Sequence, residues 1–180
     1  MYELFGGLDI LVNNAADFTR GRLEDTSDEL WERHMALNLR APFVLTQAAA
    51  PWMRERGGGS IVNIGSVNAY VGASNLLSYS VSKGGLMTFT RNVSQTLRAD
   101  RIRVNQINVG WTLTEGEQRV QLRETGSEDW LAAAVAHKPF GRLLLPEDIA
   151  RAALFFASAE SALVTGSVLD LEQGPVGSRG

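Results

Sequence analysis

The feature that most constrains the fold of this chain is an alternation of short apolar runs with longer helix-forming stretches. The apolar-rich runs lie at residues 8–12, 60–64, 102–107 and 167–171. Short, nearly continuous apolar runs are typical of strands that are covered on both faces in a parallel sheet. The alternation therefore predicts an α/β fold, a partial doubly wound parallel sheet with flanking helices, as a single domain over residues 1–180.

The composition narrows the possible functions. The 180 residues include 17 basic and 20 acidic side chains without a block of like charge, so neither nucleic acid nor an anionic membrane surface is an expected partner. The chain has no Cys, and its two His residues, His34 and His137, are far apart, so we expect no metal site. The apolar runs are too short to span a membrane, and the amino terminus lacks a signal-peptide pattern. We therefore expect a cytoplasmic protein.

Tyr79 and Lys83 are the strongest candidates for chemistry. They lie four residues apart at the start of a predicted helix that runs through Leu97, so their side chains should share one face. An ammonium favours a phenolate over a phenol, which would lower the Tyr79 pKa from its usual value of about 10. Tyr79 is therefore a candidate general acid and base. The alternative for this pair alone is a surface helix that carries both residues by chance.

Three further candidates follow predicted strands. Ser66 follows the run at 60–64 after one Gly. The turn Asn13-Asn14-Ala15-Ala16 follows the run at 8–12, and the loop from Asn108 to Thr114 follows the third run. Open α/β sheets bind ligands at the carboxyl ends of their strands, so these segments could line a cofactor cleft. For the Asn-rich turn alone, a purely structural role is equally favoured.

A capping box at Thr26 and Glu29 predicts the start of a helix that runs through Leu45 and is kinked at Pro42. Asn38 lies inside this helix, where Asn is unfavourable by propensity, so its side chain is either solvated or part of a polar network.

A polar segment at residues 115–145, predicted to be helical, follows the third strand. It is interpreted either as a substrate lid over the site or as an ordinary pair of surface helices. Pro146 then begins another predicted helix.

Together these motifs resemble those of the short-chain dehydrogenase/reductase family, classical type, over nearly the whole chain. Asn38 matches the family's helical Asn, and Ser66, Tyr79 and Lys83 match its catalytic Ser, Tyr and Lys at the family spacing. The turn at 13–16 resembles the family's Asn-Asn-Ala-Gly turn, with Ala16 in place of the final Gly.

The loop after the third strand also resembles the family's Pro-Gly loop. Val109 replaces the Pro, whereas Gly110 and Thr114 are kept. Residues 172–174, Glu-Gln-Gly, stand where Asp-Gly-Gly is usual.

The resemblance implies a Rossmann-like oxidoreductase that transfers a hydride between NAD or NADP and a small carbonyl or secondary alcohol substrate. It implies that Tyr79 exchanges a proton with the substrate oxygen and that Ser66 hydrogen-bonds that oxygen. Lys83 would lower the Tyr79 pKa and bind the nicotinamide ribose, and Asn38 would hold a water that links Lys83 to solvent. The implied cofactor-binding residues are Asn13, Asn14, Ala15, Tyr79, Lys83, Gly110, Thr112 and Thr114.

One part of the family pattern has no counterpart. The family's glycine-rich turn that cradles the cofactor pyrophosphate is not found, and Gly57 to Gly59 lie between a helix and a strand, the wrong context. We therefore expect a truncated gene product or an incomplete reading frame that begins at the family's fourth strand. The run at 8–12 would then be an unpaired apolar edge of the sheet.

Three functions stay open at this point. The chain is an oxidoreductase of this family, a non-catalytic fragment of one that acts only in subunit association, or an epimerase or dehydratase that shares the Tyr and Lys chemistry. The resemblance also implies a homo-oligomer, a dimer or a tetramer. The substrate, the choice between NAD and NADP and the direction of the reaction do not follow from the sequence.

Overall fold

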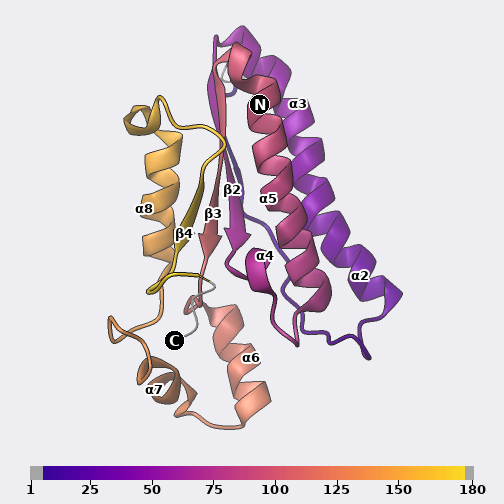
Figure 1. Cartoon of the computed structure of the whole chain (residues 1–180), viewed down its shortest axis with the longest axis vertical. Helices are drawn as coiled ribbons and strands as arrows, with labels where there is room; N and C mark the ends of the chain where they lie inside the picture. Colours follow the sequence, from indigo (N-terminus) through magenta and orange to yellow (C-terminus); the bar gives the residue numbers. More distant parts are fainter. Residues whose placement is uncertain (1–5, 177–180) are drawn as a thin grey trace.

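The computed structural model describes residues 6–176 and contains a four-stranded parallel sheet with the order β1-β2-β3-β4 (Figure 1). The strands are β1 (Ile10–Asn13), β2 (Gly59–Ser66), β3 (Ile102–Val109) and β4 (Val168–Leu171). The α-helices are α2 (Asp28–Met35), α3 (Ala41–Glu55), α4 (Asn68–Val71), α5 (Leu77–Leu97), α6 (Glu115–Thr125), α7 (Trp130–Val135) and α8 (Pro146–Ala157). A π-helical turn, η1 (Ala36–Arg40), and two 3-10 turns, η2 (Arg98–Asp100) and η3 (Ala159–Ser161), complete the described elements. The predicted α/β fold with a parallel sheet is confirmed.

Helices cover both faces of this sheet (Figure 1). Ile61 and Val62 of β2 are both fully buried, although adjacent strand residues point to opposite faces. Ile61 packs with Met53 of α3 and Leu97 of α5, whereas Val62 packs with Phe156 of α8. The burial on both faces that the apolar runs predict therefore holds for the centre of the sheet.

β1 departs from that prediction. Ile10 and Val12 are 46% and 44% exposed, while Leu11 between them packs against the core under α3 and α5. The physical reason is that α8 packs on β2 and β3 and leaves the corresponding face of β1 open. Among residues 6–176, β1 pairs with β2 alone and lies at the end of the strand order, so the predicted unpaired edge is confirmed for this part of the chain.

The helix predicted from Thr26 starts one residue later and is interrupted. Ser27 is the N-cap and accepts a hydrogen bond from the backbone N–H of Leu30 at 3.3 Å, whereas the Thr26 hydroxyl donates to a backbone carbonyl. The π-helical turn η1, which contains Asn38, separates α2 from α3, and Pro42 stands in the first turn of α3. Because Pro lacks a backbone N–H, it favours such an interruption. In place of a simple kink at Pro42, the structure has this π-helical turn directly before it.

Apart from the short helix α4, which the sequence did not predict, the remaining helices lie where the sequence predicts them. α5 carries Tyr79 and Lys83 in its first turns, and α8 starts at Pro146. The segment at 115–145 forms α6, α7 and a loop, and Figure 1 shows the two helices beyond the carboxyl ends of the central strands. In the part of the chain that the structure describes, no helix is both long and apolar enough to cross a membrane.

Candidate active site

The predicted site residues meet at the carboxyl edge of the sheet. Asn13 ends β1, Ser66 ends β2, and Gly110 follows β3 directly. Because the three strands are parallel, their carboxyl ends lie along one edge. α5 begins close to this edge and brings its own candidates to it.

Ser66, Tyr79 and Lys83 lie together, as the spacing predicts. The Ser66 hydroxyl is near enough to the Tyr79 phenol to lower its pKa, and the Lys83 Nζ lies 5.7 Å from the centroid of the Tyr79 ring. Lys83 is buried and donates a hydrogen bond to the carbonyl of Ile64 at 2.8 Å. A phenol, a hydroxyl and an amine thus share one corner of the sheet.

The pKa of Tyr79 is raised, whereas the sequence predicts that Lys83 lowers it. Burial raises the pKa of Tyr79, and the hydrogen bond from Ser66 only partly offsets it. Burial also lowers the pKa of Lys83 to about 8. Removal from water penalises the phenolate and the ammonium alike, and the ammonium of Lys83 donates to the carbonyl of Ile64. The predicted lowering of the Tyr79 pKa by Lys83 is therefore wrong for this structure.

Asn38 is part of a polar network, and the solvated alternative is wrong. The side chain is 1% exposed. Its Nδ2 donates to the Asp17 carbonyl at 2.8 Å and to the Ser82 hydroxyl at 3.1 Å, and its Oδ1 accepts from the Asp17 N–H at 2.8 Å. Since Ser82 directly precedes Lys83, Asn38 connects the loop after β1 to the helix that carries the site. Both Nδ2 hydrogens of Asn38 are donated within the protein. The water that the family resemblance implies would therefore have to bind another group of Asn38.

Asn13 has a structural role within the Asn-rich turn. Its buried Nδ2 donates to Asn63 Oδ1 at 2.7 Å and so ties β1 to β2. Asn14 and Ala15 are exposed at the same edge. Of the predicted cofactor-binding residues in this turn, these two are open to a ligand.

The loop after β3 is shaped by its own hydrogen bonds. The Thr112 hydroxyl donates to the Gly110 carbonyl at 3.1 Å, and the Thr114 hydroxyl accepts from the Glu117 N–H at 3.1 Å as the N-cap of α6. The carboxylate of Glu172 fills the space that a Cβ at Gly110 would occupy, so a larger residue there would have to displace this side chain. The predicted Gly110, Thr112 and Thr114 thus lie near the edge but already serve the loop.

Two charged residues near Tyr79 were missed by the sequence analysis. The Arg20 guanidinium forms an ion pair with the nearly buried carboxylate of Glu117 at 3.3 Å. Both charges influence the pKa of Tyr79: that of Arg20 lowers it and that of Glu117 raises it. The two residues are 97 positions apart, and no motif or spacing connects them.

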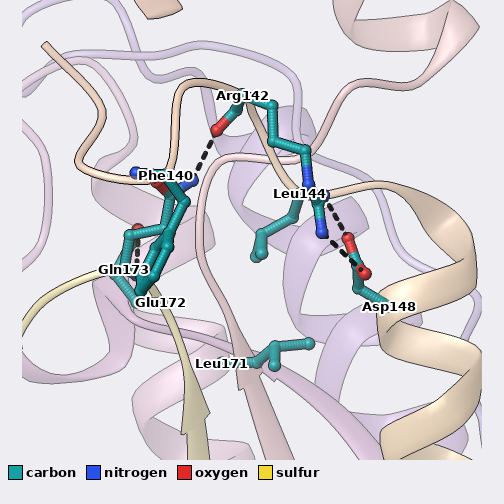
Figure 2. A pocket seen from close by; sticks show the side chains of 7 residues that line it. All are labelled: Phe140, Arg142, Leu144, Asp148, Leu171, Glu172 and Gln173. Atoms are coloured by element: carbon teal, nitrogen blue, oxygen red, sulfur yellow. Dashed lines mark hydrogen bonds and ion pairs between the residues drawn. The ribbon is translucent and has the colours of Figure 1, made fainter.

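A separate hollow of about 210 Å³ lies between the start of α8 and the end of β4 (Figure 2). The Arg142 guanidinium binds both carboxylate oxygens of Asp148, at 2.6 and 3.0 Å, and the Arg142 carbonyl accepts from Gln173 at 2.5 Å. Its lining consists of Phe140, Arg142, Leu144, Asp148, Leu171, Glu172 and Gln173, and so includes none of the predicted site residues. Within residues 6–176, no three or more His, Asp or Glu side chains are grouped to hold a metal ion.

Comparison with known proteins supplies the family. The family model described as enoyl-(acyl carrier protein) reductase matches residues 1–175. The chain is 38% identical over 172 residues to an uncharacterized oxidoreductase of Thermotoga maritima, covering 96% of the chain and 68% of the relative. It is 35% identical over 169 residues to a probable galactose dehydrogenase of Rhizobium meliloti, covering 94% and 64%.

The fold is shared with solved structures as well. The crystal structure of a putative short-chain alcohol dehydrogenase from Sinorhizobium meliloti superposes with a TM-score of 0.85 at 34% identity, covering 96% of this chain and 67% of that one. The chain thus spans about two thirds of the length of the proteins it matches. On the family model and on these relatives, the chain belongs to the short-chain dehydrogenase/reductase family.

Proposed function

We propose that this chain carries the catalytic part of an NAD- or NADP-dependent oxidoreductase that interconverts a secondary alcohol and a carbonyl compound. The observation that carries the proposal is the grouping of Ser66, Tyr79 and Lys83 at the carboxyl edge of a parallel sheet. Membership of a family of oxidoreductases supports it. A cytoplasmic homo-oligomer is part of the same proposal.

The residues at this edge fit the nicotinamide half of the cofactor. The Lys83 amine in its charged form has three N–H donors and gives one to Ile64, so two are left for ribose hydroxyls. Asn14 and Ala15 are exposed at the same edge of the sheet. When bound, the nicotinamide supplies or accepts the hydride.

Tyr79 is the proposed general acid and base. Its raised pKa keeps the phenol protonated at neutral pH, which suits donation of a proton to a carbonyl oxygen as the hydride arrives. The Ser66 hydroxyl is near enough to Tyr79 to act on its pKa, so it can also hold the substrate oxygen beside Tyr79. In the oxidation direction the phenolate is required, so the rate of oxidation should rise with pH.

Replacing Tyr79 by Phe tests this function. We would titrate the parent and Tyr79→Phe with NADH and NADPH by nicotinamide fluorescence and then screen alcohols and carbonyl compounds for turnover. Both proteins should bind the cofactor, and the parent alone should turn over. Tyr70→Phe, at a half-exposed tyrosine on α4, is the matched control and should keep activity. Turnover by Tyr79→Phe equal to that of the parent would refute the role of Tyr79.

A second function is favoured by the exposed face of β1. Ile10 and Val12 present apolar surface at the unpaired edge of the sheet, a surface suited to association with another chain. A non-catalytic subunit of an assembly would expose this strand for its partner. A uniform oligomer that does not bind either cofactor would favour this function over the enzyme.

A further inference from the structure

The carboxylate of Glu117 is held through only one of its two oxygens. Arg20 Nη2 at 3.3 Å, Trp111 Nε1 at 2.8 Å and Gln121 Nε2 at 2.8 Å all donate to Oε1. Among residues 6–176, no donor binds Oε2. The side chain is 11% exposed, so this oxygen can be reached from solvent. A nearly buried carboxylate oxygen without a donor is a good acceptor for a hydrogen bond from a ligand.

Backbone hydrogen bonds place this carboxylate close to the reacting group. The Gly21 N–H donates to the Asn75 carbonyl at 2.9 Å, and the Leu77 N–H donates to the Gly21 carbonyl at 3.0 Å. Leu77 is the first residue of α5, so Arg20 lies beside the helical turn that carries Tyr79. The charges of Arg20 and Glu117 both act on the Tyr79 side chain, which agrees with this placement.

α6 is also fixed against the loop after β1 by a second contact. Phe18 of this loop packs so closely on α6 that a Cβ at Gly116 would lie 3.2 Å from the tip of its ring. Together with the ion pair of Arg20 and Glu117, this contact holds the first turn of α6 over the site. The free oxygen of Glu117 therefore has a fixed position relative to Tyr79.

Glu117 Oε2 and Arg20 offer an acceptor and a donor side by side. Arg20 donates through Nε to Glu124 at 3.1 Å and through Nη2 to Glu117, and its Nη1 has no partner among the described residues. The carboxylates of Glu117 and Glu124 disfavour an anionic group at this oxygen. A hydroxyl can donate to Glu117 Oε2 and accept from Arg20 at the same time.

We propose that Glu117, together with Arg20, binds a second hydroxyl group of the substrate, next to the carbon that reacts at Tyr79. The substrates would then be vicinal diols and other polyhydroxylated alcohols, or the carbonyl compounds derived from them. This assignment rests on the proposed function for the identity of the reacting carbon. Glu117 is a substrate-binding residue in this scheme, and Trp111 and Gln121 position its carboxylate.

A matched pair of ligands and a matched pair of variants test the assignment. We would measure the affinity of cis-1,2-cyclohexanediol and of cyclohexanol by ligand-observed NMR titration for the parent, Glu117→Gln and Glu124→Gln. Glu124 lies on the same helix, binds the same Arg20 and loses the same charge in its variant. The parent and Glu124→Gln should bind the diol about tenfold more tightly than cyclohexanol, as one charge-assisted hydrogen bond predicts. Glu117→Gln should lose this preference.

Two results would overturn the assignment. One is a parent that binds both ligands equally or binds neither, and the other is a folded Glu117→Gln that keeps the preference for the diol. Should Glu117→Gln fail to fold by circular dichroism, Glu117→Asp replaces it, because the shorter side chain withdraws the oxygen and should lose the same preference.

Failure of the proposed function is distinguishable from failure of this assignment. A diol preference without NAD- or NADP-dependent oxidation would contradict the enzyme and keep the hydroxyl-binding site. Oxidation of cyclohexanol as efficient as that of the diol would keep the enzyme and contradict the site.

Discussion

His34 Nδ1 lies 2.7 Å from Ser78 Oγ, and this hydrogen bond joins α2 to the first turn of α5 in a fully buried setting. Ser78 directly precedes Tyr79, whose ring meets the imidazole edge-on at a centroid distance of 6.2 Å. On its other side, His34 Nε2 faces a carboxylate oxygen of Asp17 at 3.4 Å. A carboxylate at Nε2 favours the tautomer that keeps the proton there, so Nδ1 accepts the hydrogen bond from Ser78. His34 thus supports the turn that presents Tyr79.

His34 should make the stability of the fold depend on pH below neutrality. Burial lowers the pKa of His34 from its usual value of 6.5, and Asp17 opposes this only in part. The unfolded chain therefore binds a proton that the folded chain resists, so stability is lost as the pH falls from 6.5 through the pKa of the folded state. In His34→Leu this loss should vanish, and at pH 7 the variant should be about 1–2 kcal/mol less stable because Ser78 loses its partner.

Urea unfolding of the parent and of His34→Leu at pH 7, 6 and 5 checks this expectation. His137→Leu, at an exposed position, is the control and should follow the parent at every pH. Parallel curves for the parent and His34→Leu would assign the acid sensitivity to other groups.

The buried Lys83 should reduce the free energy of unfolding at neutral pH. Its pKa of about 8, against 10.5 in the unfolded chain, means that folding works against the charged form. The shift corresponds to a penalty on the order of 3 kcal/mol below pH 8. Lys83→Met removes this penalty but also the hydrogen bond to Ile64, so we expect a net gain of about 1 kcal/mol at pH 7 together with loss of turnover.

The stability cost of burying Lys83 should decrease as the pH rises. The parent becomes more stable as the pH rises from 8 to 10.5. Over this range the unfolded chain still binds the Lys83 proton, whereas the folded chain has released it. The advantage of Lys83→Met in urea unfolding should therefore shrink over this range. An advantage that grows with pH, or none at pH 7, would contradict a desolvated Lys83.

The fold and the central site could be predicted because their signals are local. A strand such as β2 is encoded by a short apolar run, and the meeting of Tyr79 with Lys83 follows from the spacing of residues in a helix. Ser66 joins them because parallel strands end at one edge. These relations need no knowledge of the long-range contacts.

The rest of the site depends on contacts that no local pattern encodes. Arg20 meets Glu117 across 97 residues only because α6 folds back over the site. The pKa of Tyr79 is set by burial, which is a property of the whole packing rather than of the spacing to Lys83. Ser27 rather than Thr26 is the N-cap because the Thr26 hydroxyl donates a hydrogen bond to a backbone carbonyl of the preceding loop.

Asn38 should tolerate no exchange of its amide for a carboxylate. In Asn38→Asp, an oxygen would replace the Nδ2 that donates to the Asp17 carbonyl and to Ser82, so two acceptors would face each other in a buried site. We expect a loss of about 2–4 kcal/mol at pH 7. The loss should decrease at acidic pH, where a protonated Asp can donate again, because burial raises the pKa of such a group.

Urea unfolding of Asn38→Asp at pH 7 and pH 5 measures both effects. Asn92→Asp makes the same exchange at an exposed position of α5 and should change stability by less than about 0.5 kcal/mol. Equal losses in the two variants would mean that the network around Asn38 contributes nothing specific.

The open face of β1 should drive self-association of the chain. Ile10 and Val12 point to the same side of the strand and are nearly half exposed, so Lys at both positions should cost little stability while placing charge on the apolar patch. We expect the double variant Ile10→Lys/Val12→Lys to remain monomeric at concentrations where the parent associates in sedimentation velocity. Leu11 between them packs into the core, so Leu11→Lys should instead destabilise the fold by several kcal/mol, on the order of a buried unpaired charge. Association of the double variant at the same concentration as the parent would place the contact on another surface.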